Sequence, residues 1–125
     1  MEQNIYLING FLESGKTTFI KDLLVQERFN SGGINLVLVC EEGDEDYDES
    51  FCTEHNVITK NLESENDFTV QNIKRIAEEI SPQQIIIEFN GMWDISRSLE
   101  HWDFGQLTEI VLLDAQCFEI YSQNL

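Results

Sequence analysis

The sequence predicts an α/β fold in which helices flank a mostly parallel sheet, and three observations support this class. Short apolar segments alternate along the chain with segments of helical periodicity. Two of the apolar segments, within residues 34–40 and 83–91, hold nearly continuous apolar runs, which are typical of parallel strands covered on both faces. A glycine-rich loop joins the first apolar segment to the first helical one. Because parallel strands need crossover connections, we expect these crossovers to be right-handed.

The expected elements follow from local patterns along the chain. Strands are expected at residues 4–9, 34–40, 56–60, 83–91 and 108–115. Helices are expected at residues 16–29 and 67–80, and a short helix or a loop at residues 93–102. In both helical segments apolar residues recur at spacings of three and four. The turn at residues 31–33 should end the first helix, and Pro82 should end the second. The last residues, 116–125, are expected to trail away from the sheet.

The loop GFLESGKT, residues 10–17, fits the phosphate-loop pattern G-x-x-x-x-G-K-[ST], with a predicted strand before it and a predicted helix after it. Glycines allow successive backbone N–H groups to point inward, and the start of the helix adds its positive dipole end. Lys16 can then reach the β- and γ-phosphates, and the Thr17 hydroxyl can join a Mg²⁺ shell. The alternative is an accidental glycine-rich turn. With its flanking elements, the loop favours a P-loop NTPase-type fold that binds a nucleotide.

A phosphate loop needs an acidic partner for the metal and its waters, and the segment IIIEFNG offers one. Glu88 follows three isoleucines at the end of a predicted strand, where it could hold a Mg²⁺-bound water or orient the attacking water. The backbone N–H of Gly91 could meet the γ-phosphate. The alternative for Glu88 is a solvated residue at a strand end. The predicted catalytic residues are Lys16 and Glu88. The predicted nucleotide-binding residues are Gly10, Glu13, Ser14, Gly15, Lys16, Thr17, Thr18 and Gly91.

The acidic segment from Glu41 to Glu49 follows a predicted buried strand, so it should emerge at the same sheet edge as the phosphate loop. Three interpretations stay open. The segment could be a switch loop whose Glu41 faces nucleotide-bound Mg²⁺, a low-affinity site for a divalent cation, or a solvated charged loop. The predicted metal-binding residues are Thr17, Glu41 and Glu88.

Composition bounds the class of protein. The 125 residues are expected to form a single domain, and 42% of them are hydrophobic, enough for a globular core. A formal net charge of -17 makes nucleic acid and anionic membranes poor partners, because both attract basic patches. Three widely spaced cysteines suit reduced thiols better than a disulfide framework, and they lack the spacing of a zinc site. With no long apolar run and no signal peptide, a cytoplasmic location is expected.

These motifs, in this order, resemble those of the CobW-like GTPases, relatives of HypB and UreG that are linked to metal insertion and metal homeostasis. The stretch GFLESGKTTFI is similar to the family's phosphate loop, and IIIEFNG to its E-x-x-G motif. The stretch VCEEGDEDYDES is similar to the family's N-E-F-G-x-x-x-x-D stretch, with Glu41, Gly43 and Asp48 at the matching positions. The resemblance spans nearly the whole chain and implies GTP and Mg²⁺ as ligands.

Two features of the family pattern are missing. The C-x-C-C metal motif has no counterpart around VITKNLESEN, and the guanine-reading motif would lie beyond residue 125. The chain is therefore expected to be the N-terminal part of a longer GTPase, or a degenerate short relative. The resemblance implies Mg²⁺-dependent GTP binding and slow hydrolysis as a switch in metal homeostasis or metal-cofactor insertion, with a metalloprotein client. The alternatives are an ATP-binding enzyme such as a small kinase, and a non-enzymatic interaction module whose acidic loop docks a basic partner.

Overall fold

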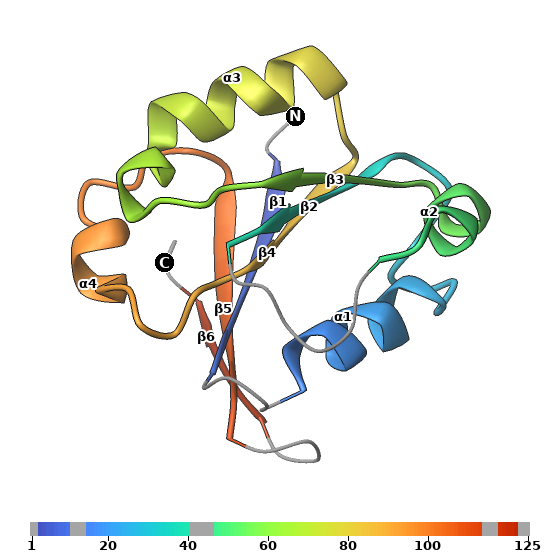
Figure 1. Ribbon diagram of the computed structural model, residues 1–125, viewed down its shortest axis with the longest axis horizontal. Coiled ribbons are helices and arrows are strands. Elements are labelled where there is room, and N and C mark those ends of the chain that lie inside the picture. The colour runs from blue at the N-terminus through green and yellow to red at the C-terminus, as the bar shows by residue number, and fades with distance from the viewer. Residues whose placement is uncertain (1–2, 11–14, 41–46, 114–117, 123–125) are drawn as a thin grey trace.

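A six-stranded mixed sheet with helices on both faces forms the fold of the computed structural model, which describes residues 3–10, 15–40, 47–113 and 118–122 (Figure 1). The strands are β1 Asn4–Gly10, β2 Asn35–Val39, β3 Val57–Asn61, β4 Gln84–Glu88, β5 Gln106–Leu112 and β6 Phe118–Ser122. The helices are α1 Lys16–Leu24, α2 Glu49–His55, α3 Val70–Ile80 and α4 Ile95–Ser98. The strand order is β3-β2-β4-β1-β5-β6, parallel except for β6 beside β5. The predicted fold class is confirmed.

The core lies on both faces of the sheet because its central strands are apolar on both sides. Ile85 and Ile87 of β4 belong to the cluster that also contains Ile73 of α3, whereas Ile86 belongs to the cluster that contains Ile20 of α1. Figure 1 shows α3 and α1 on opposite sides of the sheet. Alternate residues of a strand point to opposite faces, so a continuous apolar run serves both layers at once.

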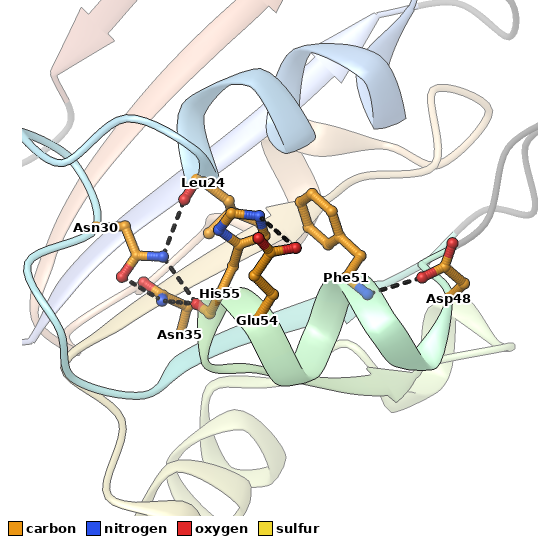
Figure 2. Close-up of polar contacts among 7 residues, drawn as sticks. All are labelled: Leu24, Asn30, Asn35, Asp48, Phe51, Glu54 and His55. Carbon is orange, nitrogen blue, oxygen red and sulfur yellow. Dashed lines mark hydrogen bonds and ion pairs between the residues drawn. The ribbon is translucent and has the colours of Figure 1, made fainter.

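The first helix ends at Leu24, so the predicted end at residue 29 was wrong. The Asn30 side-chain amide donates hydrogen bonds to the Leu24 carbonyl over 2.9 Å and to the His55 carbonyl over 2.8 Å (Figure 2). Asn35 donates to the same His55 carbonyl over 3.2 Å. These bonds join the C-terminal end of α1 to the C-terminal end of α2 at the start of β2. The helix therefore ends at the residue whose carbonyl takes part in this long-range polar junction.

Helix α2 was not predicted, because its residues 49–55 follow directly on a run of acidic residues. Its N-cap is Asp48, whose carboxylate accepts a hydrogen bond from the Phe51 backbone N–H over 2.7 Å (Figure 2). A capping aspartate satisfies a backbone donor that the first turn leaves open. Glu49, which was predicted to close the acidic loop, instead begins this helix. The remainder of the predicted loop, residues 41–46, lies outside the described residues.

Other features of the fold also differ from the prediction. The second long helix begins at Val70 rather than Asp67, because Thr69 caps it and the residues Glu65–Asp67 form a separate 3₁₀ turn. Residues 118–122 form β6, an antiparallel edge strand, instead of trailing away. No helix in the described part of the chain is both long and apolar enough to cross a membrane.

Candidate functional site

The candidate site lies where the neighbouring parallel strands β1 and β4 reach their carboxyl ends. Ile8 of β1 and Glu88 of β4 are register partners, so both strands end at one edge of the sheet. The chain enters α1 through Gly15, which caps the helix with φ 88°. This left-handed conformation is costly for residues with a Cβ, which explains a glycine at this position. Topology therefore brings the predicted phosphate loop and the predicted acidic strand end together.

Lys16 is buried at the first position of α1, with 6% of its surface exposed. Its Nζ donates a hydrogen bond to the Gly10 carbonyl oxygen over 2.8 Å. The ammonium thus lies against the start of the phosphate loop. An ammonium has three N–H donors on a flexible stem, so it can bond a loop carbonyl and also turn toward phosphate oxygens.

Thr17 and Glu88 meet directly. The Thr17 hydroxyl donates to Glu88 Oε1 over 2.8 Å, and only 7% of Thr17 and 2% of Glu88 are exposed. Glu88 is therefore not the solvated strand-end residue that the sequence left open as an alternative. A carboxylate this deeply buried is costly unless hydrogen-bond donors surround it. The pair puts a hydroxyl and a carboxylate, the oxygen donors that Mg²⁺ prefers, at the mouth of the loop.

A second hydroxyl reaches the same carboxylate oxygen. The Tyr47 hydroxyl donates to Glu88 Oε1 over 2.8 Å. Burial first, and then the charge of Glu88 and its hydrogen bond, raise the pKa of Tyr47 well above its ordinary value, so the phenol stays a neutral donor. Sequence reasoning assigned Tyr47 no role in the site. The only available signal was that it is the one aromatic residue in the acidic segment.

Tyr47 is also held from two other elements. Lys21 of α1 lies with its Nζ 5.7 Å from the centroid of the Tyr47 ring, and at the same distance from the ring of Phe51. This distance is within the range of cation–π attraction. Cys52 of α2 donates its thiol to the Tyr47 carbonyl oxygen at 3.9 Å. The tyrosine therefore links β4, α1 and α2 beside the predicted metal subsite.

Among the other predicted residues, the structure describes Gly10, Gly91 and Thr18. Gly10 and Gly91 line one cavity of about 210 Å³, together with residues from the end of β5, so the structure brings both glycines together. Thr18 is exposed near the start of α1. The predicted residues Glu13, Ser14 and Glu41 lie outside the described residues.

Both tryptophans and Cys40 belong to the apolar core on one face of the sheet or pack against it. Trp93 and Trp102 are half-buried and pack against the core, and Trp93 meets Phe89 edge-on with ring centroids 5.7 Å apart. Cys40 is buried and belongs to the core cluster of the same face. Across the described ranges, no group of three or more His, Cys, Asp or Glu side chains is arranged to hold a metal ion.

Comparison with known families agrees with this geometry. The family model described as CobW/HypB/UreG, nucleotide-binding domain, matches residues 4–124. Neither the curated proteins nor the solved structures gave a match. The matched range includes the phosphate loop, the acidic strand end at Glu88 and all six described strands. Because the match covers nearly the whole chain, the chain belongs to the CobW/HypB/UreG family and is a nucleotide-binding domain of that family.

Proposed function

We propose that this domain binds Mg²⁺–GTP and hydrolyses it slowly, as a switch in metal homeostasis or in the insertion of metal cofactors. Family membership supports nucleotide binding, and the resemblance to the GTPases within the family supports GTP over ATP. The observation that carries the proposal is the buried bond between Thr17 and Glu88, directly beside Lys16.

Lys16 would supply the positive charge for the phosphates. Its Nζ already lies at the phosphate loop through the bond to Gly10, and a small rotation of its side chain would direct the same group to phosphate oxygens. The helix that starts at Lys16 adds backbone N–H donors and the positive end of its dipole. Both effects favour the triphosphate over neutral ligands.

Thr17 and Glu88 would hold the magnesium ion and its waters. When bound, Mg²⁺ neutralises charge on the phosphates and supports the transfer of the γ-phosphoryl group. The Thr17 oxygen would bind the ion directly, while its hydrogen stays directed at Glu88. The Glu88 carboxylate would accept hydrogen bonds from metal-bound water or orient the attacking water. Gly91, beside Gly10, would offer its backbone N–H to the γ-phosphate.

The proposed switch acts on a metalloprotein client in the cytoplasm. The net charge of -17 argues against nucleic acid and anionic membranes as partners, because neither attracts an acidic surface. The three widely spaced cysteines suit a reducing compartment better than a disulfide framework. Slow hydrolysis is expected because the sequence offers no clear arginine finger, a residue that can contribute about 10³-fold or more in rate.

Calorimetric titration tests the proposal. We expect GTP to bind with one-to-one stoichiometry, more tightly with Mg²⁺ than with EDTA, and to be released as GDP at a low rate. A parallel titration with ATP separates the GTPase from an ATP-binding enzyme, because equal or tighter ATP binding would contradict the proposed base preference. Absence of any nucleotide binding would favour the interaction module over both enzymes.

A further inference from the structure

We propose that the Tyr47 hydroxyl and the hydration shell of Mg²⁺ compete for Glu88, so that Tyr47 sets how strongly nucleotide binding depends on the metal. The inference rests on the proposed function, since it concerns the same subsite. It adds a residue that the motifs do not contain.

The competition follows from the contacts of one oxygen atom. Glu88 Oε1 accepts hydrogen bonds from Thr17 and from Tyr47, each over 2.8 Å. A carboxylate oxygen has two lone pairs, so two hydroxyl donors fill Oε1. A metal-bound water that donates to the same oxygen would therefore require one of the two hydroxyls to leave.

Tyr47 is the donor that must leave. The Thr17 oxygen keeps lone pairs that can bind a cation while its hydrogen still points at Glu88. Thr17 lies in the first turn of α1 directly beside Lys16, whereas Tyr47 belongs to the acidic segment, so Thr17 is the hydroxyl placed to bind a cation at the phosphate loop. The ion and the buried carboxylate are therefore both satisfied when Thr17 keeps its bond to Glu88 and Tyr47 gives up its own.

Departure of the Tyr47 hydroxyl would also change the contacts that α2 makes with its neighbours. The Tyr47 carbonyl accepts the Cys52 thiol at 3.9 Å, and α2 begins only two residues after Tyr47. Lys21 of α1 faces the rings of both Tyr47 and Phe51. A movement of Tyr47 would therefore change the contact between Lys21 and Phe51 of α2. The accessibility of the half-buried Cys52 thiol should therefore report whether Tyr47 is in place.

The variant Tyr47→Phe isolates the hydroxyl, because it keeps the ring that faces Lys21. The affinity for a non-hydrolysable GTP analogue is measured by calorimetry, once with Mg²⁺ and once with EDTA, for both proteins. The affinity with Mg²⁺ divided by the affinity with EDTA should be about tenfold larger in Tyr47→Phe than in the wild type. This is the change expected for loss of one competing hydrogen bond to a charged group. Affinity in EDTA should not change. Tyr6→Phe is the matched control, since Tyr6 packs on Phe29 with ring centroids 5.0 Å apart and should leave the ratio unchanged.

The outcomes separate the inference from the function beneath it. An unchanged or smaller ratio in Tyr47→Phe, with a wild type that binds the analogue, overturns the competition and leaves the proposed function intact. A wild type that binds no nucleotide overturns both. A second readout uses a protein that retains Tyr47 and carries only the Cys117→Ser change. In this protein, maleimide should label Cys52 several-fold faster when Mg²⁺ and the analogue are bound than when they are absent. Equal labelling rates in the bound and free protein would also overturn the inference.

Discussion

The Thr17 hydroxyl donates a hydrogen bond to Glu88 Oε1 over 2.8 Å, although the two residues lie 71 positions apart in the chain. The contact exists because α1 starts beyond the end of β1, and β4 is the neighbour of β1 in the sheet. Both side chains are buried, so the bond is protected from water. It joins the phosphate loop to the acidic strand end before any ligand arrives.

Lys16→Ala should abolish detectable nucleotide binding, because it removes the buried cation at the phosphate loop. Calorimetry with Mg²⁺–GTP measures the effect. Lys74→Ala is the control, since Lys74 lies on α3 and pairs with Asp103 at the surface, 3.5 Å away. Unchanged affinity in Lys16→Ala would rule out the phosphate-loop assignment, and equal losses in both variants would indicate a general effect of charge.

Glu88→Gln should keep nucleotide binding and lower the rate of hydrolysis. The amide preserves the size of the side chain but removes the charge that handles water and metal. Release of phosphate under single-turnover conditions measures the rate, and calorimetry measures the binding. The buried amide has an oxygen that can still accept from Thr17 and Tyr47, so the fold should persist. Hydrolysis at the wild-type rate would show that Glu88 takes no part in the reaction.

The protein should hold no tight zinc ion on cysteine. Cys40 is buried and directly follows β2, and Cys52 lies on α2. A zinc site needs four converging ligands, and the spacing of the three cysteines supplies no chelating pair. Metal analysis after dialysis should therefore find zinc well below one equivalent per chain. Stoichiometric zinc that is lost in Cys52→Ser would refute this expectation.

Much of the fold could be predicted because local patterns determine it. The apolar run before Glu88 predicts a buried strand whatever its neighbours, and the spacing of Gly10, Gly15 and Lys16 predicts a phosphate loop before any contact is known. The same local evidence places Glu88 at a strand end. The sequence order of strand, loop and helix then suffices to place both motifs at one edge of the sheet.

Other features either depend on contacts between distant residues or had only a weak local signal. The carbonyl of Leu24, the last residue of α1, accepts a hydrogen bond from Asn30, which also bonds the His55 carbonyl of another helix. The start of α2 was missed because its cap, Asp48, is one of many acidic residues in a row. Tyr47 was missed as a site residue because its partner, Glu88, lies 41 residues away and is reached only through the fold.

The central claim is that Thr17 and Glu88 form the magnesium subsite of a nucleotide site, and the variant Thr17→Val tests it most directly. Valine keeps the shape of the side chain but removes the hydroxyl, so the affinity for a GTP analogue should fall in Mg²⁺ to nearly its value in EDTA. Thr59→Val, on the exposed edge strand β3, is the control and should keep the full Mg²⁺ dependence of the wild type. If Thr17→Val binds the analogue with the same Mg²⁺ dependence as the wild type, the bond between Thr17 and Glu88 does not mark a metal subsite.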